Sequence, residues 1–292
     1  NDTVRLVLLV RMGSAASTAS GAGVKASVSA SSVEDLKTTF STLSPAEKQK
    51  MMDALCGNTK PSSKPVLQYF SICGRGEVAR LICVAGDVEF EDKAWAPAFD
   101  ESGGWRAGYK AIGEGMGYPG VLPILEHGDL KLFQTTAIES YLASLSPKYS
   151  GLADAQKAKD MMFQLIKSDI NGSTESLLFK KITADDLKPT MEKWYGIVEG
   201  LLPEKGFVNG LEFPTPADIS VLVIAQGCMP FRAAVQMAGC APTKDKYPKM
   251  FRVASETAAY GKVPEFLKTG SEHKTLKADP FGIMPAEYAA EM

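Results

Sequence analysis

The feature that most constrains the fold is a change of periodicity near Ser150. Before this point, short runs rich in β-branched and aromatic residues alternate with helix-like segments, and after it apolar residues recur at helical spacing. The segments expected in the first half are strands at Val66–Phe70, Val88–Asp92, Leu122–Glu126 and Leu130–Phe133, and helices at Glu77–Ala85 and from Thr136 to Leu145. This order predicts a small α/β domain followed by an all-helical domain.

Local signals indicate where several of these elements begin and turn. Thr136 and Glu139, like Thr215 and Asp218, stand three residues apart before an apolar run, which is the spacing of a helix capping box. The tripeptide His127–Asp129 has a central glycine and is typical of a hairpin turn. In the helical half, one apolar stripe at helical spacing predicts a core helix. Its members are Leu187, Met191, Trp194, Val198 and Leu201.

Composition narrows the functions that the chain can have. At 292 residues, it has room for two ordinary domains and an extension. A net charge of −2 without a basic stripe argues against nucleic acid as a partner. The five cysteines form no C-x-x-C pair and the two histidines stand far apart, so we expect no metal site and a reducing compartment. No apolar run approaches the roughly 18 residues that span a bilayer, which predicts a soluble body.

Residues 1–64 differ in composition from the rest and are predicted to form an extension. Residues 3–33 carry basic side chains at Arg5, Arg11 and Lys25 but no acid, and most of this segment is Ser, Ala and Gly. Such a composition favours an organellar transit segment or a linker, with a disordered tail that carries no address as the alternative. The expected location is the cytoplasm or, for a transit segment, the interior of a plastid or mitochondrion.

Within the extension, the capping signature Ser44-Pro-Ala-Glu47 predicts a short helix from Lys48 to Leu55. The domain boundaries that follow are an extension over residues 1–64, an α/β domain over 65–146, an all-helical domain over 152–270 and a tail over 271–292.

Three motifs in the α/β domain carry a family resemblance. They are Pro65-Val-Leu-Gln-Tyr-Phe-Ser-Ile-Cys-Gly-Arg-Gly-Glu-Val-Ala-Arg80, Val121-Leu-Pro-Ile-Leu125 and Lys131-Leu-Phe-Gln-Thr-Thr-Ala-Ile-Glu-Ser-Tyr-Leu142. Together they resemble the glutathione-binding half of a cytosolic glutathione S-transferase of the Tyr-using, sigma-like kind. The resemblance extends from Pro65 to roughly Leu267. It implies a thioredoxin-like N-terminal domain, an all-helical C-terminal domain and a homodimer.

The resemblance assigns the chemistry to Tyr69 and Arg75. A thiol with a pKa of about 8.5 is mostly protonated at neutral pH and is then a poor nucleophile. The resemblance implies that the Tyr69 hydroxyl donates a hydrogen bond to the glutathione thiolate and that the charge of Arg75 favours the same anion. Ser71 and Cys73 are the alternatives, because other branches of the superfamily use Ser or Cys a few residues along as the partner of the sulfur.

The other two motifs imply further glutathione contacts. Leu122 and Pro123 resemble the family's cis-proline turn, which offers a backbone N–H and C=O to the cysteinyl part of glutathione. Gln134 and Thr135 stand in the place of a Gln-Ser pair that grips the γ-glutamyl group. The start of a helix favours a carboxylate there, because its backbone N–H groups and its dipole attract negative charge.

The resemblance to the family is weakest in the glycine-rich loop from Lys93 to Gly120. Trp105 and Lys110 are the candidates for holding the glycyl carboxylate, with Trp95 as the alternative to Trp105. The acceptor pocket is expected near Met161 to Phe163, on the first helix of the second domain. Asp160 is the candidate for the family's cross-subunit acid.

These residues predict a glutathione transferase that conjugates glutathione to a small hydrophobic electrophile, as in detoxification, or uses it as an isomerase cofactor. The alternative is a non-catalytic transferase-like subunit of a larger assembly, an organellar one included, anchored by residues 1–64. Val121 favours this alternative, because relatives often carry Lys or Gln there, whereas Tyr69, Pro123 and Gln134 favour the enzyme. A thioredoxin-type oxidoreductase is disfavoured by the lack of a C-x-x-C pair.

Overall fold

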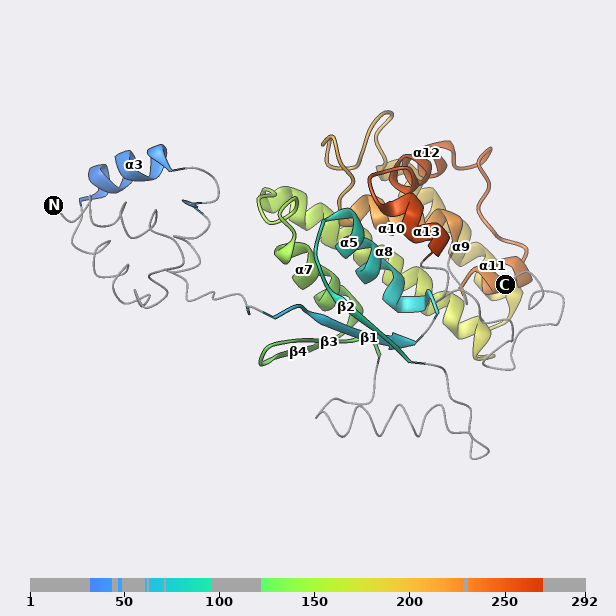
Figure 1. Cartoon of the computed structure of the whole chain (residues 1–292). Coiled ribbons are helices and arrows are strands. Elements are labelled where there is room, and N and C mark those ends of the chain that lie inside the picture. Colours follow the sequence, from blue (N-terminus) through green and yellow to red (C-terminus); the bar gives the residue numbers. More distant parts are fainter. Residues whose placement is uncertain are drawn as a thin grey trace. The chain divides into compact units, whose positions relative to one another are not determined.

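The computed structural model describes residues 32–43, 47–48, 61, 63–70, 72–95, 122–227 and 231–269. The contacts divide the chain into two compact units, residues 1–62 and 63–292. In the first unit, the described helix α3 spans Val33–Thr42 (Figure 1) and is absent from the expectations above. Residues 3–31 of the transit-like segment lie outside the described residues, and so does the helix expected from Lys48 beyond its first residue.

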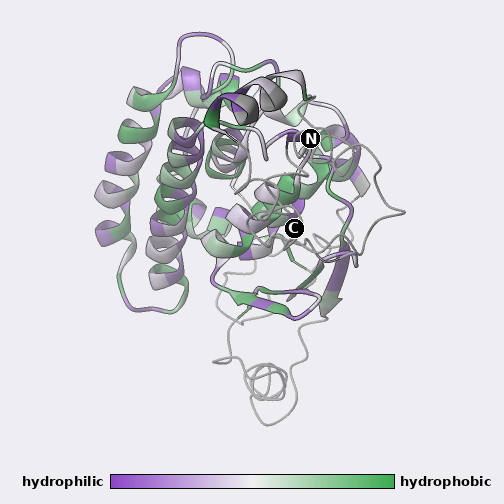
Figure 2. Ribbon diagram, turned by 90° about the vertical axis from the view of Figure 1, so that its left-hand side faces the viewer, coloured by the Kyte–Doolittle hydropathy of each residue, from purple (hydrophilic) through white to green (hydrophobic). Residues whose placement is uncertain are grey.

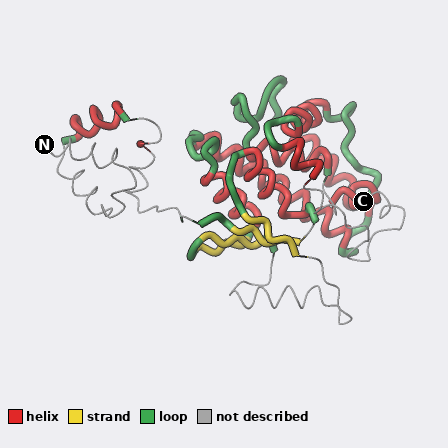
Figure 3. Tube along the Cα trace, viewed as in Figure 1, coloured by secondary structure: helices red, strands yellow, loops and turns green. Residues whose placement is uncertain are grey.

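The second unit begins with a four-stranded mixed sheet whose strand order is β2-β1-β3-β4 (Figure 3). The strands are β1 (Val66–Phe70), β2 (Glu91–Trp95), β3 (Ile124–His127) and β4 (Leu130–Phe133). β1 pairs with β2 in parallel and with β3 in antiparallel orientation, and β3 pairs with β4 as a hairpin. The thioredoxin-like layout that the resemblance implies is thereby confirmed.

β2 begins three residues later than expected. The prediction placed this strand at Val88–Asp92, but the ladder starts where Glu91 pairs with Val66. The Glu91 N–H donates to the Pro65 carbonyl at 2.9 Å, whereas Val88 and Phe90 pack against the core from the preceding loop. These loop residues are therefore apolar because they are buried, and not because they pair in the sheet.

Two helices cover one side of the sheet. α5 (Glu77–Ala85) and α7 (Thr135–Leu145) pack together on the side that faces the helical layer (Figure 1). The capping box predicted for Thr136 and Glu139 is wrong, since α7 begins at Thr135 and the Glu139 carboxylate is fully buried. Glu139 forms an ion pair with Lys167 of the next helix, because a buried carboxylate needs a compensating cation.

The helical part follows the sheet domain. Its helices are α8 (Asp154–Leu178), α9 (Ala184–Leu201), α10 (Pro216–Gln226), α11 (Phe231–Met237), α12 (Pro248–Ala258) and α13 (Val263–Thr269). α10 lies at the centre, because every residue from 216 to 225 is buried and the helix contacts α5, α8 and α12. Figure 2 shows hydrophilic and hydrophobic residues alternating around the surrounding helices, as amphipathic helices require.

The sequence predicts a capping box at the start of α10 and a buried apolar stripe along α9. The capping box of α10 is confirmed, since the Asp218 carboxylate accepts the Thr215 N–H at 2.8 Å. The apolar stripe predicted to lie in the core falls on α9. Its first member, Leu187, is fully buried, but its last, Leu201 at the helix end, is 45% exposed. No single described helix is long and apolar enough to cross a membrane, and α10 with α11 meets that test only as a bent pair.

Candidate functional site

Tyr69 lies near the end of β1, and the turn from Gly74 to Gly76 covers its ring. The side chain is only 6% exposed. A methyl group on Gly74 would lie 2.4 Å from the Tyr69 oxygen, and one on Gly76 would lie 2.6 Å from the ring. Gly74 also has φ +42°, in the left-handed region that side chains rarely adopt. The two glycines therefore allow the turn to approach the ring.

The phenol oxygen of Tyr69 is hydrogen-bonded to the same turn. The Arg75 backbone N–H donates to the Tyr69 hydroxyl at 2.9 Å. Because the phenol oxygen is the acceptor in this contact, the bond does not use the O–H proton that thiolate stabilisation requires. A hydroxyl that accepts one hydrogen bond is polarised and becomes a stronger donor in another. The turn thus orients the hydroxyl and strengthens it as a donor.

Arg80 of α5 braces this region, although the sequence analysis did not single it out. Its guanidinium is fully buried and donates to the carbonyl oxygens of Phe70 and Ile72 at 3.1 and 2.8 Å. It also pairs with Asp92 of β2 at 2.8 Å and lies 5.6 Å from the centre of the Tyr69 ring, a cation–π distance. The sequence signal is an arginine among the apolar residues that follow Glu77 in α5, because such a residue is buried only when its charge is compensated.

The Arg75 guanidinium has a partner that the sequence did not reveal. Glu175 of α8 accepts hydrogen bonds from Nε of Arg75 at 2.6 Å and from Nη2 at 2.7 Å. Burial alone would lower the pKa of Arg75, but the hydrogen bond and the negative charge of Glu175 outweigh burial and raise that pKa. Arg75 is therefore cationic with its charge balanced locally, and it ties the turn over Tyr69 to the helical part.

The peptide bond between Leu122 and Pro123 is cis, as the resemblance implies. β3 starts directly after it, and Gln68 pairs with Ile124 in the antiparallel ladder. One further step along this ladder brings the buried Pro123 opposite Tyr69. Two residues that the resemblance assigns to one site therefore lie at the same end of the sheet.

Gln134 and Thr135 form the start of α7 beside these strand ends. Phe133 pairs with Ile124, so Gln134 occupies the next position, alongside Pro123. Gln134 is exposed and has φ +77°, a backbone conformation that costs about 1–3 kcal/mol in a residue with a side chain. Residues strained in this way cluster at ligand-binding sites, which supports the predicted γ-glutamyl contact.

The predicted contacts to the glycyl carboxylate fall in a part of the chain that is not described. Trp105 and Lys110 lie outside the described residues, and so does Ser71, one alternative to Tyr69. Of Trp95, only the backbone at the end of β2 is described. The other alternative, Cys73, is a buried thiol.

The start of α8 has roles other than those expected. Asp160 is buried and accepts hydrogen bonds from the Thr215 hydroxyl at 2.6 Å and the Ala217 N–H at 3.1 Å, so it caps α10. Phe163 belongs to the core, and Met161 is 46% exposed. This segment is therefore not the wall of the cavity that the structure describes.

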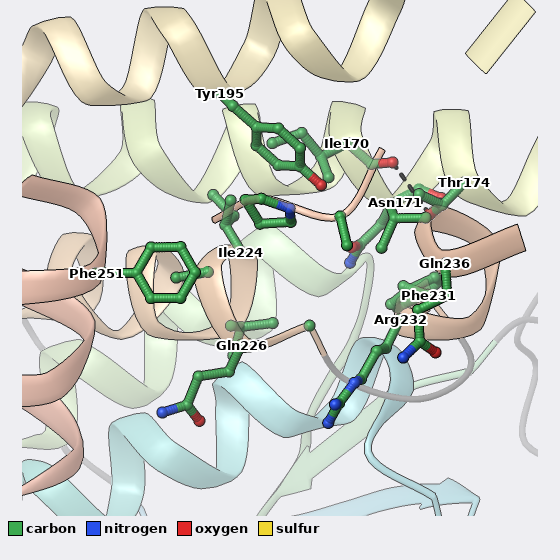
Figure 4. A pocket seen from close by; sticks show the side chains of 16 residues that line it. Ile170, Asn171, Thr174, Tyr195, Ile224, Gln226, Phe231, Arg232, Gln236 and Phe251 are labelled. Atoms are coloured by element: carbon green, nitrogen blue, oxygen red, sulfur yellow. Dashed lines mark hydrogen bonds between the residues drawn. The ribbon is translucent and has the colours of Figure 1, made fainter. Parts of the chain in front are cut away.

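That cavity lies further along α8 (Figure 4). It has a volume of about 400 Å³ and is lined by residues of α8 to α12. Ile170, Asn171 and Thr174 come from α8, and the next residue, Glu175, pairs with Arg75. The cavity lining and the ion pair that holds the turn over Tyr69 thus draw on consecutive residues of α8.

Comparisons with known proteins point to one family. Residues 65–144 match the family model described as glutathione S-transferase, N-terminal domain. A glutathione S-transferase from Tyrophagus putrescentiae is 33% identical over 136 residues, which are 45% of this chain and 59% of that protein. A putative glutathione S-transferase alpha-2 from Dictyostelium discoideum is 25% identical over 213 residues, which are 73% of this chain and 98% of that protein.

A solved structure shows the same fold. A glutathione S-transferase from Caenorhabditis elegans superposes with a TM-score of 0.56 at 20% identity, covering 70% of this chain and 98% of that one. The fold of the second unit is therefore shared across both of its parts.

Proposed function

We propose that this chain, which belongs to the glutathione S-transferase superfamily, conjugates glutathione to small apolar electrophiles, with the Tyr69 hydroxyl stabilising the thiolate. One observation carries the proposal. The Tyr69 oxygen is held by the Arg75 N–H, and its strand position lies opposite Pro123, which follows the cis peptide bond. A thiol bound against that peptide would lie beside the strand position of Tyr69.

Glutathione would then lie across the strand ends. The backbone at the cis peptide would hold its cysteinyl part, and Gln134 and Thr135 at the start of α7 would hold its γ-glutamyl carboxylate. Trp105 and Lys110 remain the predicted partners of the glycyl carboxylate. This placement directs the sulfur to Tyr69.

In the proposed reaction, the glutathione thiol loses one proton and its sulfur forms one S–C bond. The thiol releases its proton to solvent, and the hydrogen bond from Tyr69 stabilises the sulfur anion. A sulfur electron pair then forms the S–C bond, while a leaving group departs with its bonding pair. For an activated alkene, the π pair moves to the neighbouring carbon, which takes a proton from water. Lowering the thiol pKa by roughly two units needs about 2.7 kcal/mol of differential stabilisation.

The acceptor would occupy the cavity in the helical part. A volume of about 400 Å³ lies within the range of small-molecule sites, and Val223, Ile224 and Phe231 form part of an apolar lining. Glu175, which follows the lining residue Thr174 in α8, holds the turn over Tyr69 through Arg75, and this link supports the cavity as the acceptor site.

A second copy of the chain is the proposed partner. Met161, Met162 and Leu165 are 46%, 39% and 50% exposed, and their spacing places them on one face of α8. Large apolar side chains gathered on a helix face favour burial against another protein, and homodimers are the commonest assemblies. An assembly through residues 1–64 stays a prediction.

The experiment is retention on immobilised glutathione, followed by conjugation of glutathione to 1-chloro-2,4-dinitrobenzene by the wild type and by Tyr69→Phe. The wild type should be retained and active, and Tyr69→Phe should be retained with kcat/KM lowered by roughly 10- to 100-fold. Equal activity of the two proteins would remove the role of Tyr69. Retention without any turnover would indicate the non-catalytic subunit. Product formed without consumption of glutathione, from an isomerisable substrate, would indicate an isomerase.

A further inference from the structure

The cavity in the helical part carries a charge that an apolar acceptor would not need. Of the 16 described residues that line it, none is acidic and one, Arg232, is cationic. Arg232 lies on α11, is exposed, and makes no ion pair within the described part of the chain. The lining therefore bears a positive charge in a protein whose net charge is −2.

A buried amide also faces this space. Asn171 is 4% exposed and points into the cavity (Figure 4), and its side chain makes no hydrogen bond with the described residues. Tyr195 is 2% exposed and directs its hydroxyl toward the same space from α9 (Figure 4). Both polar side chains border the open space of the cavity, so a bound polar atom would take the place of water as their hydrogen-bond partner.

The polar groups are distributed unevenly around the cavity. In Figure 4, Gln226 and Arg232 lie on one side, and Tyr195 and Ile170 lie on the opposite side. Apolar side chains such as Phe251 form the wall between them. The cavity is thus amphipathic, with an exposed cation at one side and a buried amide within.

We infer that the acceptor is an apolar electrophile that also carries a carboxylate, with the carboxylate on Arg232 and an inner polar atom on Asn171. A guanidinium presents a planar fork that matches the two oxygens of a carboxylate, and no acid in the lining competes for it. As a statement about the acceptor, this inference rests on the proposed function. As a statement about what the cavity binds, it can be tested without glutathione.

The experiment is displacement of the anionic dye 8-anilino-1-naphthalenesulfonate, whose fluorescence rises in an apolar site, from the full chain. The two competitors are decanoate and decanol, which share a chain length and differ in charge, both used below their micellar and solubility limits. We compare the wild type with Arg232→Met and Asn171→Leu. The matched control is Lys157→Met, which removes an exposed cation of α8 roughly 20 Å from Ile170 by the rise of the helix.

In the wild type and in Lys157→Met, decanoate should bind at least roughly tenfold more tightly than decanol. Arg232→Met should bring the two competitors to similar affinity. Asn171→Leu should keep the preference for decanoate, because decanoate has no second polar atom to meet Asn171, and the dye fluorescence should show that each variant keeps a folded site. Equal affinities in the wild type, an unchanged preference in Arg232→Met, or loss of the dye on adding glutathione would overturn the inference. Failure of the conjugation assay alone would count against the proposed function and leave these binding results intact.

Discussion

Arg75 and Glu175 stand 100 residues apart in the sequence, yet they form a two-point ion pair with N–O distances of 2.6 and 2.7 Å. The pair joins the turn that covers Tyr69 to α8, the helix that also lines the cavity. Their side chains are 24% and 29% exposed, so the contact is largely shielded from water. The position of the proposed thiolate donor therefore depends on a contact between the sheet domain and the helical part.

The first prediction concerns the strength of this pair. A double-mutant cycle with Arg75→Met and Glu175→Met should give a coupling energy of about 1–3 kcal/mol in urea unfolding, because the hydrogen bonds are charge-assisted and largely buried. The matched control is the exposed pair Lys246–Glu192, at 55% and 47% exposure, which should couple by less than about 1 kcal/mol. Equal coupling in the two cycles would contradict a structural role for Arg75.

The second prediction concerns the turn over Tyr69. Gly74→Ala should lower kcat/KM by more than roughly tenfold, because the added methyl group would meet the Tyr69 oxygen at 2.4 Å and displace it. It should also destabilise the protein by about 1–3 kcal/mol, since the native φ of +42° disfavours alanine. The control is Gly196→Ala in α9, where the same methyl group meets open space and should stabilise by about 0.5–1 kcal/mol. A Gly74→Ala enzyme with full activity would show that the hydroxyl position is unimportant.

The third prediction concerns the buried ion pair between α7 and α8. Glu139 and Lys167 are 0% and 1% exposed, and burial raises the pKa of Glu139 even with Lys167 beside it. Lys167→Met should therefore lower the free energy of unfolding by about 3–5 kcal/mol, because it leaves a buried carboxylate without a cation.

A rescue variant separates this effect from loss of packing. The double variant Glu139→Leu with Lys167→Met should regain most of the stability, since no buried charge remains. Lys159→Met, which removes an exposed cation from the same helix, should change stability by less than about 0.5 kcal/mol. A double variant as unstable as Lys167→Met would show that the pair contributes through its shape.

The fourth prediction concerns pH. Burial raises the pKa of Asp160 from 3.8 to about 6, against the hydrogen bonds that it accepts from Thr215 and Ala217. Because the folded-state pKa is the higher one, the folded protein holds this proton between about pH 4 and 6 after the unfolded chain has lost it. The contribution of Asp160 to stability is therefore complete below about pH 4 and is lost as the pH rises through about 6.

The matching variant is Asp160→Asn, which keeps an oxygen acceptor for the donors of the α10 cap and cannot ionise. The free energy of unfolding of Asp160→Asn, relative to that of the wild type, should rise between pH 4 and pH 7 by up to about 3 kcal/mol. Urea unfolding of both proteins across this range measures the difference. A constant difference would mean that Asp160 has the same pKa in the folded and unfolded states.

The sequence predicted those parts of the fold that depend on local periodicity and turns. β1 and α5 have the predicted bounds, because each combines a clear period with a clear stop. The predicted start of β2 is three residues too early, because Val88 and Phe90 belong to the preceding loop and are apolar since they pack against the core. α3 was missed although Ser32 and Asp35 stand at the spacing of a capping box, since the surrounding low-complexity composition outweighed that signal.

In the candidate site, only those residues that belong to a short local motif could be predicted from the sequence. The turn with its glycines, the cis peptide and the start of α7 are each local, and the sheet brings them together. Glu175, which pairs with Arg75, and Lys167, which pairs with Glu139, lie on α8 far along the chain. No spacing rule links such partners, because their contact exists only after the helical part has packed on the sheet domain.

The role of Tyr69 is tested most directly by the pKa of the bound glutathione thiol, measured by titrating the ultraviolet absorbance of the thiolate in the wild type and in Tyr69→Phe. We expect a bound pKa roughly two units below that of free glutathione in the wild type and a value near that of free glutathione in the variant. The same bound pKa in both proteins would contradict the claim that the Tyr69 hydroxyl stabilises the sulfur anion.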